Sequence, residues 1–140
     1  MQTFNLNDLV AESERGDQRW REFLQASSLS MGLYRLKAGR ADEQQPHTEA
    51  ELYFVIGGKA LFRAGGQEQA VVPGSVIFVE RAVEHRFLDI TEDLTVLVFF
   101  APPEGSLKIG VVAALGAGRS AVMRRAGVGV TRPILALARL

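Results

Sequence analysis

The feature that most constrains the fold is a series of short apolar runs that end at glycine, proline or a polar turn. Pairs of such residues at 57–58, 65–66 and 73–74 separate four of these runs. Turn residues at this close and regular spacing are typical of an antiparallel sandwich or barrel, and they argue against a parallel sheet. We therefore predict at least seven strands, over residues 28–36, 51–56, 59–64, 67–72, 75–80, 84–90 and 94–100.

Two runs carry further information about the arrangement of these strands. Gly57 and Gly58 join residues 51–56 to residues 59–64, which predicts a hairpin. The runs 51–56 and 94–100 are apolar at both odd and even positions, so we expect them in the middle of the structure.

The residues before the strands have a different character. Residues 7–24 are predicted to begin with a short helix, with Asn7 or Asp8 as its N-cap and Gly16 at its end. Residues 1–18 are polar and acidic and lack the apolar segment of a secretory signal. No apolar run is long enough to span a bilayer. These features predict a cytoplasmic protein.

The formal net charge is zero, but the charges are unevenly distributed. Residues 1–105 hold ten Lys/Arg and sixteen Asp/Glu, a balance of 10 − 16 = −6, whereas residues 106–140 hold six Lys/Arg and no acid. We expect a β-barrel domain over 1–105 and a basic, Gly/Ala-rich, poorly ordered extension over 106–140. The alternative for the extension is a partly helical element that contacts an anionic membrane, an RNA or a partner.

The chain has no cysteine and only two histidines, His47 and His85. Without thiolates, a metal ion can be bound only by imidazole, carboxylate, amide or water. Gln45, His47 and Glu51 share one parity beside a predicted strand, and His85 begins another strand that a closed barrel could bring opposite. Two imidazoles and one carboxylate form a facial triad with open coordination positions. The competing interpretation is that each histidine is an ordinary surface or hydrogen-bonded residue.

The spacing of these residues resembles the first motif of the cupin family. In that motif a glycine is followed by five residues, His-x-His, three or four residues, Glu, six residues and Gly. Every interval is kept here, with glutamine in place of the first histidine, by Gly39, Gln45, His47, Glu51 and Gly58.

The second cupin motif has a similar counterpart in the stretch PGSVIFVERAVEHRFLD. It contains a Pro-Gly turn, a strand and His85, and Asp89 stands where the family usually has Asn. The usual Pro-Ala-Gly before the histidine is replaced by residues 80–82. The resemblance covers roughly residues 28–100. It implies an all-β fold, a small antiparallel β-barrel or double-stranded β-helix (jelly roll) with a short N-terminal arm.

The resemblance also implies a metal site with His47, Glu51 and His85 as ligands and Gln45 in the remaining ligand position. An amide oxygen is a weaker ligand than imidazole, so the triad does not depend on Gln45. Glu49 could replace Gln45 or accept a hydrogen bond from an imidazole, or it could be a solvated loop carboxylate. The expected cofactor is a divalent ion, Fe(II) first and Mn(II), Ni(II) or Zn(II) behind it.

An apolar pocket is expected beside the metal. Tyr53 and Val55 share the parity of Glu51, and Phe87 shares that of His85, so these three side chains should line it. Arg35 or Arg63 could bind an anionic substrate through the guanidinium fork, although exposed arginines are common on strands.

The expected function is that of a metal-dependent oxygenase or isomerase acting on a small polar organic molecule, in a homodimer by resemblance. The alternative is a non-catalytic cupin that binds a small molecule or metal as a sensor or carrier. The chain has no phosphate-binding loop and no nucleophile elbow, and no nucleic-acid partner is expected.

Overall fold

The computed structural model describes residues 1–107, which form an antiparallel jelly roll with a short N-terminal arm. The predicted fold class is confirmed. Apart from Ser106 and Leu107, the predicted C-terminal extension lies outside the described residues. Within residues 1–107, no helix is long and apolar enough to cross a membrane. The elements are α1 (Leu6–Arg15), β1 (Trp20–Gln25), β2 (Ser30–Leu36), β3 (Ala50–Ala64), β4 (Gln67–Val71), β5 (Val76–Val79) and β6 (His85–Ala101).

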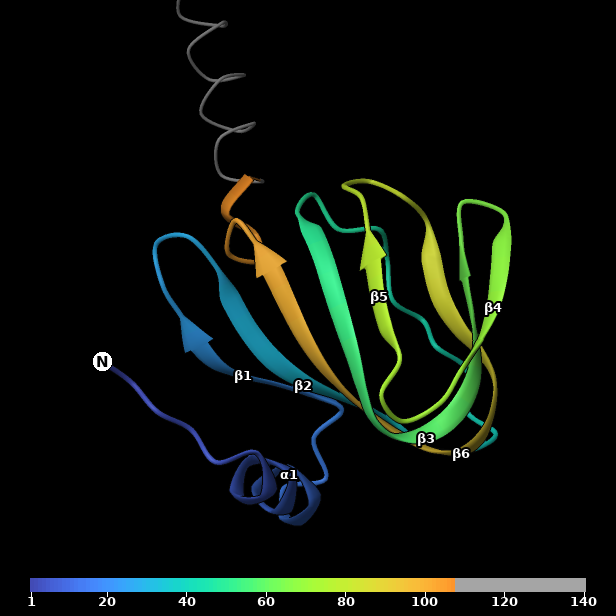
Figure 1. The fold of residues 1–140 in the computed structure, drawn as a ribbon, viewed down its shortest axis with the longest axis horizontal. Helices are drawn as coiled ribbons and strands as arrows, with labels where there is room; N and C mark the ends of the chain where they lie inside the picture. Colours follow the sequence, from blue (N-terminus) through green and yellow to red (C-terminus); the bar gives the residue numbers. More distant parts are fainter. Residues whose placement is uncertain (108–140) are drawn as a thin grey trace, which may run out of the picture. The chain divides into compact units, whose positions relative to one another are not determined.

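Two long, bent strands, β3 and β6, form the frame of the molecule. They pair with each other along nearly their whole length, from Ala50 opposite Ala101 to Ala64 opposite His85. Figure 1 shows both strands running down one side of the molecule, turning at the bottom and rising on the other side. The predicted hairpin at Gly57 and Gly58 is therefore wrong, because the runs 51–56 and 59–64 are two halves of one strand. The runs 84–90 and 94–100 merge into β6 in the same way.

The bend divides the strands between two curved layers. On one side of it, the first half of β3 pairs with β5 and with the second half of β6, which continues to β2 and β1. On the other side, the second half of β3 pairs with β4 and with the first half of β6. The pairing register shifts between Val55 and Leu61, which marks the bend.

Gly58 lies where β3 turns against β6. Its φ is +94°, and a Cβ atom there would lie 2.4 Å from the carbonyl oxygen of Asp93 and 2.6 Å from Cα of Leu94. These neighbours are backbone atoms and cannot rotate away. Gly57 has open space around its own Cβ position. The two glycines of the pair therefore have different roles, and only Gly58 allows the close approach of the two strands.

The N-terminal segment contains the predicted helix and an unpredicted strand. The side chain of Asn5, rather than Asn7 or Asp8, caps α1 by accepting from the backbone N–H groups of Asn7 (2.9 Å) and Asp8 (3.3 Å). The helix ends at Gly16, as predicted. Beyond it, β1 was missed because charged and apolar residues are mixed within it.

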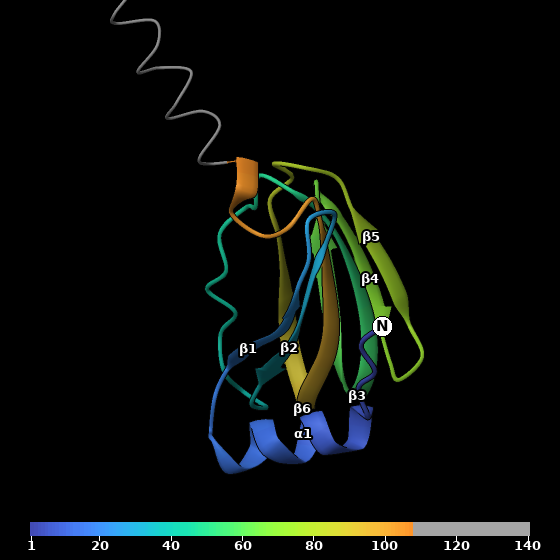
Figure 2. The ribbon, with the colours of Figure 1, turned by 90° about the vertical axis from the view of Figure 1, so that its left-hand side faces the viewer.

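Helix α1 lies at the same end of the molecule as the bends of β3 and β6 (Figure 2). Two ion pairs attach it to the sheet: Glu12 pairs with Arg21 of β1, and Glu14 lies 3.6 Å from Arg35 of β2.

The core lies between the two layers and is built from alternate residues of each strand. Along the first part of β3, Glu51, Tyr53 and Val55 are buried, while Leu52 and Phe54 between them are less buried and face outward. The same alternation in β6 buries Val96, Val98 and Phe100. A buried carboxylate and a buried phenol thus sit on the inner face of an otherwise apolar strand, which requires partners for both.

The bend provides a matched pair of substitutions. We expect Gly58→Ala to lower the free energy of unfolding by about 3 kcal/mol, because it adds a methyl group against backbone atoms at a positive φ. Gly57→Ala should change it by less than about 1 kcal/mol. Urea denaturation followed by circular dichroism measures both. Equal losses in the two variants would contradict the assigned role of Gly58.

Candidate functional site

The two histidines and Glu51 come together where β3 begins and where β6 begins. His47 lies in the loop before β3, Glu51 is the second residue of β3, and His85 is the first residue of β6. His47 Nδ1 lies 2.5 Å from Glu51 Oε1, and His85 Nε2 lies 3.4 Å from Glu51 Oε2. One potential ligand atom from each residue lies within 4.8 Å of the others. Glu51 and His85 are almost fully buried and His47 is partly exposed.

Backbone contacts hold both imidazoles in place. The carbonyl oxygen of His47 accepts a hydrogen bond of 2.9 Å from the backbone N–H of Ala82, which joins its loop to the turn before His85. The ring of His47 packs edge-on against Phe100, with centroids 5.0 Å apart. His85 Nδ1 lies 2.7 Å from the carbonyl oxygen of Val83. A carbonyl can only accept, so Nδ1 of His85 carries the proton and Nε2 is directed at Glu51.

These three residues fit a divalent cation. Nδ1 of His47 is buried and makes no hydrogen bond in the structure, even though Glu51 lies beside it. An unsatisfied imidazole nitrogen next to a carboxylate is the environment that a cation would complete. Two imidazoles and one carboxylate also match the donor set of the facial triad.

Tyr53 closes the inner side of the cluster. Its hydroxyl donates to Glu51 Oε2 and lies 2.8 Å from His85 Nε2 and 3.3 Å from the amide oxygen of Gln44. Burial and the adjacent carboxylate of Glu51 raise the pKa of Tyr53 far above its ordinary value. The phenol therefore keeps its single proton at neutral pH.

The charge state of the cluster follows from its contacts. Burial alone would raise the pKa of Glu51, but contacts with His47, His85 and Tyr53 lower it to about 2. Burial lowers the pKa of His85, yet Glu51 and the Val83 carbonyl raise it above its ordinary value overall. Glu51 is thus an anion, and Nε2 of His85 is a position that accepts either a proton or a metal ion.

A buried carboxylate, Asp42, supports the cluster from the loop between β2 and β3. Its Oδ1 accepts from the Tyr34 hydroxyl at 2.6 Å, and its Oδ2 accepts from the backbone N–H of Phe87 at 2.9 Å. Gln44 donates to Oδ2 at 2.7 Å, and its amide oxygen lies 3.3 Å from the Tyr53 hydroxyl, so a chain of polar contacts runs from Asp42 to Glu51. Sequence reasoning missed Asp42 and Gln44, because nothing in the polar segment ADEQQP distinguishes them from their exposed neighbours.

Gln45 and Glu49 do not occupy the positions that the sequence suggested. Gln45 is exposed, and its amide nitrogen lies 3.4 Å from the carbonyl oxygen of Glu43; its neighbour Gln44 is the amide that reaches the cluster. Glu49 is buried, and its Oε1 accepts from the Thr48 hydroxyl at 2.9 Å and from the backbone N–H of Leu107 at 3.1 Å. It therefore supports the end of the described chain.

A cavity of about 360 Å³ opens beside the cluster. It combines aromatic walls with a few polar groups, and is lined by Arg19, Trp20, Tyr34, Glu43, Gln44, His47, Tyr53, Val98, Phe100 and Glu104. Of the three side chains expected to line a pocket, Tyr53 lies on its wall. Val55 and Phe87 instead belong to the buried hydrophobic core, with the Phe87 ring perpendicular to that of Tyr53 at 5.7 Å.

Comparison with known proteins agrees with this architecture. The family model described as Cupin domain matches residues 32–100. An uncharacterized protein from Streptomyces coelicolor is 44% identical over 104 residues, which cover 74% of this chain and 99% of that protein. The crystal structure of TT1209 from Thermus thermophilus has a TM-score of 0.59 at 20% identity, covering 74% of this chain and 99% of that one. An RmlC-like cupin with a double-stranded β-helix fold from Methanocaldococcus jannaschii has a TM-score of 0.54 at 15% identity, covering 61% and 84%.

The hydrogen bonds of Asp42 predict a specific loss of stability. Asp42→Asn leaves one acceptor oxygen and turns an NH₂ group toward donors on Tyr34 or Phe87, so we expect the free energy of unfolding to fall by about 2 kcal/mol. The same change at its exposed neighbour, Glu43→Gln, should cost less than about 0.5 kcal/mol. Chemical denaturation of both variants measures the difference, and similar values for the two would contradict the supporting role of Asp42.

Proposed function

This chain belongs to the cupin family, and on that premise we propose that it binds a divalent metal ion through His47, Glu51 and His85. We further propose that it acts on a small polar organic molecule held in the adjacent cavity, as a metal-dependent oxygenase or isomerase. The observation that carries the proposal is the meeting of two imidazoles with one ionised carboxylate. One of those imidazoles has a buried nitrogen without a hydrogen bond.

The donor set narrows the choice of metal. Two nitrogen ligands and one carboxylate, with no thiolate anywhere in the chain, suit borderline divalent ions. We place Fe(II) first, with Mn(II), Ni(II) and Zn(II) behind it. When bound, such an ion supplies Lewis acidity and, in the case of iron, O₂ activation. With only three protein ligands, such an ion would also be able to bind substrate oxygens.

The chain's own residues would bind and orient the substrate. Trp20, Tyr34 and Phe100 offer apolar surface within the cavity, and Arg19 and Glu104 add charged groups to its lining. Tyr53 holds a proton at the cavity wall, next to Glu51 and His85. A phenol in this position would be placed to exchange a proton with a bound substrate.

Glu104 has a second role in the same proposal. Its Oε1 lies 3.8 Å from Nε2 of His47, the ring nitrogen opposite the one that faces Glu51. A carboxylate in this position favours the tautomer in which Nε2 carries the proton and Nδ1 is free to bind the metal.

A non-catalytic role, in which the barrel binds a small molecule or a metal as a sensor or carrier, is the alternative function. The cavity and the three ligands would serve it equally well, and the fold is compatible with both. Oxygen consumption and substrate turnover by the metal-loaded protein, measured together, distinguish the two classes. Uptake of O₂ that depends on an added organic substrate supports an oxygenase, conversion of a substrate without O₂ uptake supports an isomerase, and ligand binding without turnover supports the carrier.

Metal content tests the ligand set directly. We expect about one ion per chain in the reconstituted protein, and a loss of affinity greater than about 100-fold in His47→Ala and in His85→Ala. Gln45→Ala is the control, since Gln45 is exposed and should not alter the stoichiometry. Elemental analysis and isothermal titration provide the values. Full metal content in both histidine variants would contradict the proposal.

We also propose that two copies of the chain pair through an outward apolar face of the larger layer. Neighbouring strands align Phe78 and Val76 of β5 with Leu52 and Phe54 of β3, and these with Phe99 and Leu97 of β6. Phe78 and Val76 are 61% and 64% exposed. These six side chains carry no charge, so the same patch on a second copy complements it.

A single charge in this face should separate the copies. We expect the wild-type chain to elute as a dimer and Phe78→Asp as a folded monomer, because each dimer would bury two facing carboxylates. Gln69→Asp, on β4 outside the face, should remain dimeric. Light scattering after size exclusion gives the masses. A monomeric wild type at tens of micromolar protein would refute this part of the proposal.

A further inference from the structure

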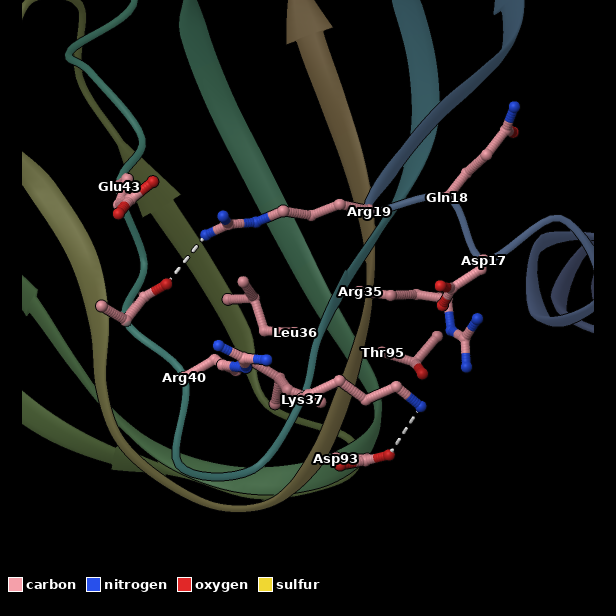
Figure 3. Close-up of a pocket in the computed structure, with 12 residues that line it drawn as sticks. Asp17, Gln18, Arg19, Arg35, Leu36, Lys37, Arg40, Glu43, Asp93 and Thr95 are labelled. Atoms are coloured by element: carbon pink, nitrogen blue, oxygen red, sulfur yellow. Dashed lines mark hydrogen bonds and ion pairs between the residues drawn. The ribbon is translucent and has the colours of Figure 1, made fainter.

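A second cavity, of about 400 Å³, lies next to the one at the histidine cluster. Arg19 and Glu43 line both cavities and stand between them. The walls come from segments far apart in the sequence: residues 17–19 before β1, the end of β2, the loop after it, and the bend of β6. Figure 3 shows Arg19 reaching across from the segment before β1 toward this loop, with Arg40 beneath it.

This cavity concentrates positive charge in a part of the chain that is otherwise acidic. Four of the ten Lys/Arg of residues 1–105 line it, namely Arg19, Arg35, Lys37 and Arg40, against three acids. Its local balance is thus 4 − 3 = +1, while the balance over residues 1–105 is 10 − 16 = −6. A concave site with low-dielectric walls strengthens the attraction of such a group of cations for an anion.

The guanidinium groups keep many unused donors. Within residues 1–107, the side chain of Arg40 makes no hydrogen bond or ion pair. Arg19 hydrogen-bonds through Nη2, at 3.0 Å from the carbonyl oxygen of Ala41 and 3.5 Å from Asp42 Oδ1, and its guanidinium carbon lies 5.6 Å from the centre of the Tyr34 ring. Each guanidinium has five N–H donors, so most of those on Arg19 and Arg40 remain available.

The remaining two cations are already engaged and contribute mainly their charge. Lys37 forms an ion pair of 3.1 Å with Asp93, and Arg35 lies 3.6 Å from Glu14 of α1. Arg35 is only 15% exposed, and its Nε is buried without a hydrogen-bond partner. Its position beside the cavity is therefore fixed, and it adds positive potential there that Glu14 offsets only in part.

We propose that this cavity binds the oxyanion group, carboxylate or phosphate, of a small ligand, with Arg19 and Arg40 as its direct ligands. The planar fork of each guanidinium matches two oxygens of such a group. Arg35 and Lys37 strengthen binding through their charge. The site is separate from the histidine cluster and does not depend on a metal ion there.

Titration of the full-length, chelator-treated protein tests this site. Inorganic phosphate and malonate serve as probes, and sodium chloride at equal ionic strength serves as the blank. We expect saturable heat and a rise in Tm with phosphate, with malonate or with both, and the pattern identifies the preferred oxyanion. Arg40→Gln should weaken binding about tenfold or more, since it removes the charge and the fork together. Arg40 is exposed, so the variant should fold normally.

Two further variants separate this site from general attraction to basic residues. Arg63→Gln, at an exposed arginine of β3 paired with Glu68, should bind the probes like wild type. Arg40→Lys keeps the charge without the fork and should bind with intermediate affinity. Amide chemical shifts in labelled protein should move in residues 36–43 on titration. The absence of saturable binding, equal losses in the Arg40 and Arg63 variants, or shifts confined to the basic residues 108–140 would each overturn the proposal.

Discussion

The structure depends on the close contact between the backbones of β3 and β6 where both strands bend. An extended strand rises about 3.3 Å per residue, so the thirteen residue-to-residue steps from Glu51 to Ala64 would span about 43 Å if β3 were straight. His85 pairs with Ala64, at the far end from Glu51. Nevertheless His85 Nε2 lies 3.4 Å from Glu51 Oε2, because the two strands fold back together. The contact at Gly58 thus decides whether the three cluster residues meet at all.

The same bend explains how a polar cluster can sit inside an apolar barrel. Glu51 and Tyr53 follow the inward parity of β3, and the turn before β6 delivers His85 to the same interior. Each buried polar group then satisfies another: the phenol donates to the carboxylate, and the amide of Gln44 connects the phenol to Asp42. Nδ1 of His47 lies beside Glu51 without the geometry of a hydrogen bond, which is why a cation is the simplest completion of the site.

Much of this arrangement could be predicted from the sequence, and the remainder shows where local patterns lose information. Apolar runs and turn residues predicted an antiparallel β fold, and the cupin spacing indicated His47, Glu51 and His85 as a group. A Gly pair between two apolar runs, however, looks the same in a hairpin and in a bent strand. The distinction depends on the backbone of Asp93, thirty-five residues from Gly58. Parity likewise failed at Gln45, because the segment before β3 is a loop in which alternation of side chains does not hold.

Asp42 and the residues that line the second cavity could not be predicted from the sequence for a different reason. Asp42 is defined by its contacts with Tyr34 and Phe87, which come from two other strands, and no local signal marks it. The second cavity, which Arg19 and Arg40 line, is likewise formed by side chains from four separate segments of the chain. In both cases the chemistry follows from tertiary packing, which spacing along one chain does not encode.

Anomalous X-ray diffraction from crystals grown with Mn(II) or Zn(II), measured at the absorption edge of the ion, tests the central claim most directly. The account predicts one strong peak per chain, within bonding distance of His47, Glu51 and His85. A peak at another place would contradict it. So would the absence of any peak at a saturating concentration of the metal ion, with the Tyr53 hydroxyl still in contact with His85 Nε2.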